Sequence, residues 1–149
     1  MRMRGYPRWF YTALMVTIAI LVVTGGLLAP TAFELRLEWE VPWRLAADHH
    51  IIVAALHAAI SFLMLAMVGA LWSVHMRAGW KRKRSLYTGI GLLFFLGALG
   101  FTAIGIYYLG DDKASVISSV AHMCLGAALP LLLAIHDVIG RRYHVIFNQ

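Results

Sequence analysis

Four histidines stand inside apolar stretches of this 149-residue chain. His57 and His75 belong to one stretch, and His122 and His136 belong to another. A titratable ring is costly in a lipid environment and marks a functional site there. Imidazole nitrogen is a common ligand of transition metals and of haem iron. Because paired histidines on two helices of a bundle are suited to hold a flat macrocycle, the pattern favours bis-histidine ligation of two haems.

The spacing of the histidines agrees with this chemistry but is uneven. At about 100° per residue, the 18-residue step from His57 to His75 makes about five full turns, so both rings leave one helix face. The 14-residue step from His122 to His136 misses alignment by about 40°. The two steps rise about 27 Å and about 21 Å. Side-chain reach, tilted haem planes or a π-bulge would have to absorb the difference, and a single haem is the alternative.

Small residues follow two of the histidines by one helical turn. Ser61 and Gly126 each lie four residues beyond a histidine, so they leave space on the same face for a macrocycle. Small residues also serve to pack membrane helices against one another, and that alternative stays open. The cations expected near haem propionates, or else as solvated charges, are Arg77, Lys81, Arg141 and Arg142 at one end and Arg44 and Lys113 at the other.

The elements that would position these residues are four apolar segments. The chain is 61% hydrophobic and only 13% charged, and each segment has the roughly 20 residues that cross a ~30 Å hydrocarbon core. We predict helices over 9–30, 51–74, 86–109 and 115–139. The fold class expected is an all-α membrane protein, a single four-helix up-and-down bundle over residues 1–149. No length remains for a nucleotide-binding, flavin or aqueous catalytic domain.

Two local expectations follow from the sequence. The first helix is expected to end at Gly25-Gly26, with Pro30 beyond it, because proline ends or kinks a helix. The following residues 33–40 alternate apolar and charged side chains, so they suggest a strand-like or interfacial segment. Cys124 is the single cysteine, and we expect it to be a small packing residue.

The charge distribution predicts the topology. Lysines and arginines gather before the first segment, between the second and third, and after the fourth, whereas the other two connections are mainly acidic. Because short basic loops stay in the cytoplasm, both termini are expected there. The net charge of +6 then reflects topology and contact with lipid headgroups rather than nucleic acid. In this topology His57 faces His122 at the outer level and His75 faces His136 at the inner level.

The His122-x3-Gly126 element, the 13 residues that separate His122 from His136, the second helix with two histidines and the four-helix layout together resemble a known family. They are similar to the small bacterial di-haem b-type cytochromes. These include cytochrome b561-like proteins and the membrane cytochrome b subunits of hydrogenases and formate dehydrogenases. The resemblance implies haem b, electron exchange with quinone and a place in the bacterial cytoplasmic (inner) membrane. The first helix departs from some members because it has no histidine.

We therefore expect an electron-transfer subunit that relays electrons between quinone and a periplasmic or membrane redox partner. A stand-alone quinone reductase of the superoxide-oxidising or ferric-reducing kind is the alternative within this class. A histidine-lined metal-ion transporter and a plain structural anchor are the alternatives outside it. The transporter would need carboxylates or thiolates beside the histidines, and Asp137 alone comes close.

Two sets of residues are candidates for a quinone site. At the inner level Asp137 is a proton donor, Trp72 an apolar wall, and Arg77 and Arg141 cations for developing negative charge. At the outer level the alternative set is His50 with its neighbours His49 and Asp48. Asp137 is also spaced for a salt bridge to Arg141, four residues on. We favour the inner set.

Overall fold

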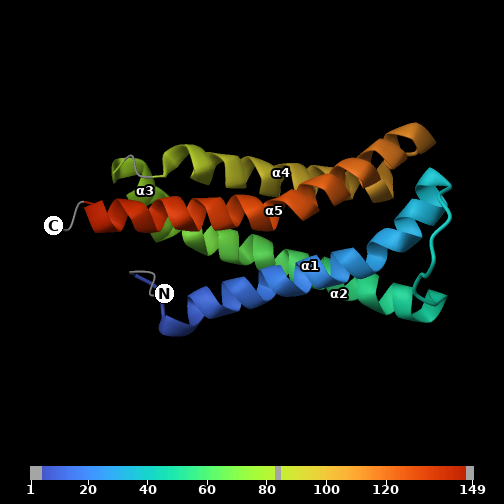
Figure 1. The fold of residues 1–149 in the computed structure, drawn as a ribbon, viewed down its shortest axis with the longest axis horizontal. Helices are drawn as coiled ribbons and strands as arrows, with labels where there is room; N and C mark the ends of the chain where they lie inside the picture. The colour runs from blue at the N-terminus through green and yellow to red at the C-terminus, as the bar shows by residue number, and fades with distance from the viewer. Residues whose placement is uncertain (1–4, 83–84, 147–149) are drawn as a thin grey trace. The chain divides into compact units, whose positions relative to one another are not determined.

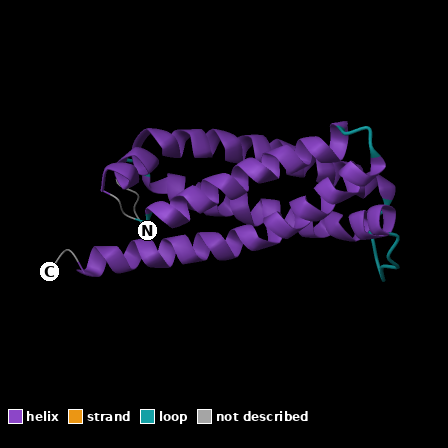
Figure 2. Cartoon of the chain, turned by 90° about the horizontal axis from the view of Figure 1, so that it is seen from above, coloured by secondary structure: helices purple, strands orange, loops and turns teal. Residues whose placement is uncertain are grey.

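The computed structural model describes residues 5–82 and 85–146, and the side chains of residues 5–81 and 85–140. Within these ranges the chain is helical, and no strand occurs. The elements in order are α1 (Arg8–Leu37), α2 (Ala47–Leu71), the π-helix η1 (Trp72–Met76), α3 (Arg77–Arg82), α4 (Leu86–Tyr108) and α5 (Asp112–Ile146). Figure 1 follows them along the chain, and Figure 2 shows that helices, in purple, make up nearly all of it.

Four helical stretches are long and apolar enough to cross a membrane. They are Arg8–Leu37, Ala47–Lys81, Leu86–Tyr108 and Asp112–Gly140. The prediction of four helices long and apolar enough to cross a membrane, in an all-helical fold, is therefore confirmed for the described residues. Each stretch except the third extends beyond its predicted ends, because polar residues at the boundaries continue the helix.

The contacts divide the chain into two compact units, residues 1–72 and residues 73–149, with the boundary inside η1. In the first unit α1 packs against α2, and in the second α4 packs against α5. Contacts along each pair run in opposite directions: Tyr6 reaches Ala70 while Thr24 reaches His57. Each pair is thus an antiparallel helical hairpin.

The face of α1 that contacts α2 is a seam whose buried residues recur at intervals of three, four or seven. Its buried residues are Phe10, Leu14, Thr17, Ile18, Thr24 and Thr31, and those of α2 are Met64 and Met67. Such a spacing keeps successive side chains on one side of a helix. Three of them are threonines seven residues apart, so the seam carries hydroxyl groups at regular intervals.

The expected end of the first helix is wrong, since α1 continues through Pro30 to Leu37. Pro30 lacks the N–H that would bond to the carbonyl of residue 26, and a helix in a membrane bundle tolerates such a proline where other groups satisfy the freed carbonyl. The helix ends at Glu38, whose φ of 56° is left-handed. The strand-like expectation is likewise wrong for residues 33–37, which form the last turns of α1.

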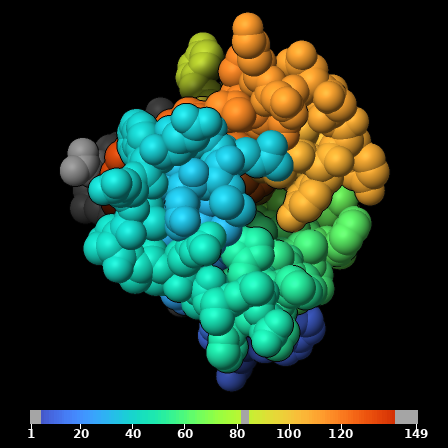
Figure 3. All heavy atoms as spheres, turned by 90° about the vertical axis from the view of Figure 1, so that its right-hand side faces the viewer, coloured from blue at the N-terminus to red at the C-terminus, as the bar shows by residue number. Residues whose placement is uncertain are grey.

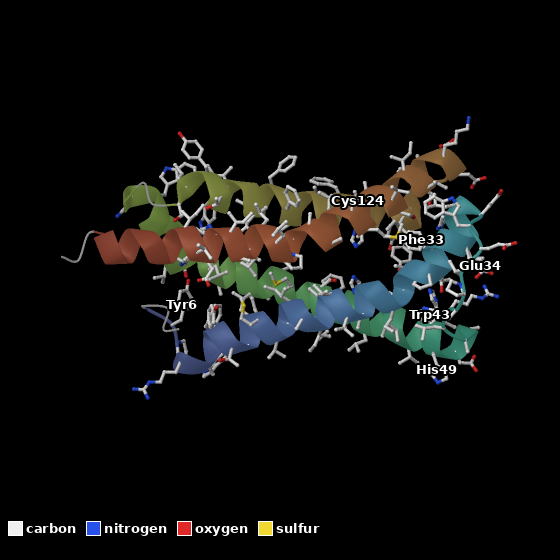
Figure 4. All side chains as sticks on the ribbon, viewed as in Figure 1. Tyr6, Phe33, Glu34, Trp43, His49 and Cys124 are labelled. Atoms are coloured by element: carbon white, nitrogen blue, oxygen red, sulfur yellow. The ribbon has the colours of Figure 1, made fainter. Side chains whose placement is uncertain are left out.

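The connection from α1 to α2 folds back on the end of α1. The Phe33 and Trp39 rings stack with centroids 5.8 Å apart, and Arg44 Nε lies 3.3 Å from Glu34 Oε2. In Figure 3 this connection forms the cyan surface at one end of the first unit. Figure 4 places Phe33, Glu34 and Trp43 at that end and Tyr6 at the other.

The turn from α4 to α5 is much shorter and is closed by specific contacts. Leu109 is extended, and Asp111 Oδ1 accepts a hydrogen bond from the Ala114 N–H at 2.8 Å, which caps α5. One turn into each helix, Gly105 is buried against Ser118. A Cβ at position 105 would overlap the Ser118 hydroxyl and lie 2.9 Å from its Cβ, so only glycine fits there.

The π-helix η1 interrupts the segment that carries His57 and His75, and His75 lies within it. A π-turn holds one more residue than an α-turn. We expected the His57 and His75 rings on one helix face by assuming an uninterrupted α-helix. That assumption does not hold across η1. The π-bulge, one of the adjustments that the uneven histidine spacing called for, is confirmed.

Candidate functional site

Two of the four histidines come together in the second unit. The ring of His75, on η1, and the ring of His136, on α5, have centroids 6.2 Å apart, and their planes make an angle of 69°. His136 is half-buried, whereas His75 is exposed. π-Helices occur frequently at functional sites. The predicted inner pair is thus a pair of neighbouring rings in the structure.

Three of the histidines each contact the hydroxyl of a different threonine, and in each case the ring atom is Nδ1. Thr24 Oγ1 lies 2.8 Å from His57 Nδ1. Thr88 Oγ1 lies 2.8 Å from His136 Nδ1. Thr102 Oγ1 lies 3.0 Å from His122 Nδ1. In each pair the threonine belongs to the first helix of a hairpin and the histidine to the second.

Each of these threonines also bonds to the backbone of its own helix. The hydroxyl of Thr24 donates to the Ile20 carbonyl at 2.7 Å. Thr102 donates to the Ala98 carbonyl at 2.9 Å, and Thr88 donates to the Ser85 carbonyl at 3.1 Å. Threonine commonly makes this bond to a carbonyl of the preceding turn inside a helix. The oxygen atoms are therefore fixed on their helices before they meet the rings.

Glycines beside two of the threonines give the rings room. A Cβ on Gly25 would lie 3.3 Å from His57 Cε1, closer than nearly all real Cβ contacts. A Cβ on Gly89 would lie 3.6 Å from His136 Cε1, an ordinary van der Waals distance. The Thr24-Gly25 pair therefore fits its histidine more tightly than the Thr88-Gly89 pair.

His57 and His122 belong to different units, and their pairing stays a prediction. Ser61 is exposed, and its hydroxyl donates to the His57 carbonyl at 2.8 Å, so it bonds to the backbone of its own helix. Nothing lies within 4 Å of a Cβ built on Gly126, so space is open beside that residue. Arg77 is exposed at the start of α3, and the side chain of Arg141 lies outside the described part of the chain.

The candidate quinone residues are found at both ends of the helices. Asp137 is half-buried and directly follows His136, while Trp72 is exposed at the start of η1. His50 is half-buried in the first turn of α2. Cys124 is exposed on α5, so the expectation that it packs inside the chain is wrong. Figure 4 shows Cys124 on that helix and His49 near the start of α2.

The sequence analysis missed the three threonines, although a signal for two of them was present. Thr88 and Thr102 are 14 residues apart, as are His122 and His136. In an antiparallel hairpin, equal spacings on the two helices place both pairs at matching levels. The shared interval was therefore enough to predict two Thr–His contacts once α4 and α5 were taken as neighbours.

Comparison with protein-family models, curated protein sequences and solved structures gives no match for this chain.

Proposed function

We propose that this protein is a membrane b-type cytochrome that binds haem b through histidines and relays electrons between a redox partner and quinone. The observation that carries the proposal is the neighbouring pair of rings, His75 and His136. Two imidazoles that meet inside a pair of membrane-crossing helices are expensive to keep without a ligand. The pair lies where the sequence predicts the inner haem.

The geometry of the pair fits axial ligation. A metal–imidazole bond is about 2 Å long and the nitrogen lies roughly 1.1 Å from the ring centroid, so two imidazoles that would hold one iron between them would have centroids about 6 Å apart. The observed 6.2 Å agrees with this value.

The number of side chains favours haem over a bare metal ion. A bare ion takes about four protein ligands, whereas haem iron needs only axial ligands because the porphyrin provides the rest. Among the residues that the structure describes, no three His, Cys, Asp or Glu side chains gather to hold an ion. A pair of histidines is sufficient for haem, and it is what the second unit offers.

In this proposal His75 and His136 would hold the inner haem, and His57 and His122 are each proposed as ligands of a second haem. Bound haem supplies one-electron chemistry, because its iron alternates between the ferric and ferrous states. The helices contribute the ligands and an apolar surround that excludes water and sets the potential. Arg77 and Arg141 are the proposed cationic partners of the propionates, with Ser61 and Gly126 leaving space on the histidine faces.

The basic clusters support a location in the bacterial inner membrane with both termini in the cytoplasm. In this orientation the inner histidines lie toward the cytoplasm. Asp137, next to His136, is then the proposed proton donor to quinone, with Trp72 as an apolar wall. The chain is thus proposed to act as one subunit with a redox partner, which receives or supplies the electrons.

The optical spectrum of the purified protein tests the haem proposal. We expect a Soret band and a pyridine haemochrome of the b type, with haem that acid-acetone extracts completely because no covalent attachment motif is present. Two haems per chain are expected from the two histidine pairs. A protein that is folded and fully helical but neither carries nor takes up haem would contradict the proposal.

Stopped-flow oxidation of the reduced protein by a quinone analogue tests the quinone site. We expect Asp137→Asn to slow this oxidation at unchanged haem content, because the amide cannot deliver a proton. His50→Ala, at the opposite end, is the matched control and should oxidise normally. The reverse result would assign quinone to the outer end.

A further inference from the structure

We propose that Thr24, Thr88 and Thr102 are positioning residues that fix three histidines in one tautomer, with the proton on Nδ1 and the lone pair that would bind iron on Nε2. The tautomer follows from the hydrogen bonds alone, and its use for iron rests on the proposed function. The three contacts involve the same pair of atoms, Oγ1 and Nδ1, in two separate hairpins. A repeated choice of Nδ1 over Nε2 leaves the same nitrogen available each time.

The direction of each hydrogen bond follows from how the hydroxyl is used. A hydroxyl group has one hydrogen and two acceptor lone pairs. In all three threonines the hydrogen goes to a backbone carbonyl of the preceding turn. With the hydrogen on the carbonyl, the oxygen accepts from the ring and Nδ1 carries the proton.

His122 provides an independent argument for the same tautomer. Its Nδ1 lies 3.2 Å from the carbonyl oxygen of Leu99, in addition to 3.0 Å from Thr102 Oγ1. A carbonyl oxygen accepts and never donates. A protonated Nδ1 satisfies both neighbours, whereas an unprotonated one would face the carbonyl with a lone pair.

A protonated Nδ1 decides what the other nitrogen can do. Neutral imidazole has one N–H, so Nε2 then has a lone pair and is the metal-binding atom. Histidines that bind metals almost always donate their second N–H to a fixed acceptor, which orients the ring. Here the acceptor is a neutral hydroxyl rather than a carboxylate, so the helices hold the ring without adding a charge inside the membrane.

The three sites differ in how much depends on the threonine. Leu99 gives His122 a second acceptor, which remains if Thr102 is replaced. For His136, Thr88 is the acceptor that the structure describes. We therefore expect Thr88→Val, which keeps the side-chain shape and removes the hydroxyl, to have a larger effect than Thr102→Val.

Thr31 provides a matched control on the same seam as Thr24. Both are buried, and they lie seven residues apart on one face of α1. Within the described part of the chain the Thr31 hydroxyl has no hydrogen-bond partner. Thr31→Val therefore changes the same surface without touching a histidine, and Thr24→Val removes the bond to His57.

The first measurement needs no haem. The full-length apoprotein with ¹⁵N-labelled histidine in detergent is studied by NMR at about pH 8, where an ordinary imidazole is neutral. We expect Nδ1–H signals for His57, His122 and His136. In Thr88→Val, the His136 signals should shift toward a mixture of both tautomers, while Thr88→Ser should retain the wild-type pattern. A predominant Nε2–H form in the wild-type protein would overturn the proposal.

The second measurement is titration of the apoproteins with haemin. Loss of a hydrogen-bond partner of a metal-binding histidine typically costs about 10–100-fold in affinity. We expect a loss of this size at one site in Thr88→Val and Thr24→Val, a smaller loss in Thr102→Val, and none in Thr88→Ser or Thr31→Val. Equal affinity in Thr88→Val and wild type would overturn the role of the hydroxyl in haem binding. If the wild-type protein takes up no haem, the proposed function fails, while the NMR result still decides the tautomer.

Discussion

The two hairpins use the same Thr–His contact with different regularity. In the α4–α5 hairpin the contact occurs twice, at matching intervals of 14 residues on both helices. In the α1–α2 hairpin it occurs once, between Thr24 and His57. Thr17 and Thr31, seven residues before and after Thr24, show no such contact with a histidine among the described residues. Thr17 contacts the sulfur of Met67, and Thr31 has no partner among the described residues. A hydroxyl at the right interval is thus not sufficient, because a histidine must stand opposite it.

The largest expected effect comes from removing one ring of the inner pair. His136→Ala eliminates the ring contact with His75 and the hydrogen bond of Thr88, so we expect complete loss of one haem. The count of haems by pyridine haemochrome measures this result. His57→Ala and His122→Ala should each remove the other haem, and leave the same residual spectrum if those two histidines bind one iron. Different residual spectra would show that His57 and His122 do not bind the same iron.

A smaller effect is expected where α4 and α5 approach most closely. Gly105→Ala would force its Cβ against Ser118, and overpacking of this kind costs about 1–3 kcal/mol. We expect thermal unfolding in detergent, followed by circular dichroism, to show this loss of stability. Gly97→Ala in the same helix meets nothing within 4 Å, so it should be neutral or slightly stabilising. Equal stability of the two variants would mean that the close contact is not maintained in solution.

The smallest effect distinguishes the two Thr-Gly pairs. Gly25→Ala requires the His57 ring to move by a few tenths of an ångström, whereas Gly89→Ala makes an ordinary contact with His136. A helical Gly→Ala change gains about 0.5–1 kcal/mol by itself. We therefore expect Gly89→Ala to be stabilising and Gly25→Ala to gain little, with the NMR signals of His57 shifted only in the latter. A shifted His136 in Gly89→Ala would reverse this order.

The sequence was sufficient to predict four helices long and apolar enough to cross a membrane, because their apolar length is visible in it. It also allowed a π-bulge in the second helix as one of several ways to reconcile an 18-residue interval with one of 14, and η1 is such a bulge. Pro30 was misleading: proline normally ends a helix in water, yet α1 continues through it to Leu37, as membrane helices can. Alternation over residues 33–40 was misleading for a related reason, because a helix end near an interface also mixes apolar and charged side chains.

The histidine partners show the limit of reading one segment at a time. Thr88 and Thr102 are unremarkable within α4, and their role depends on which helix lies opposite and in what register. That register is determined by Gly105 and the capped turn before α5, both of which are local features of the sequence. Ser61 and Gly126, in contrast, were predicted to leave space for a macrocycle because they are small. Size alone does not determine what fills the space beside them.

The short turn between α4 and α5 also affects how the protein enters the membrane during synthesis. Three residues, Leu109 to Asp111, separate the two helices. With so short a link, α5 begins to emerge from the ribosome as soon as α4 is complete, and Asp111 already caps its first turn. We expect the pair to insert as one preformed hairpin, with its backbone groups satisfied before they reach the lipid. The Thr–His contacts of the second unit would then be formed at the moment of insertion, before any later assembly step.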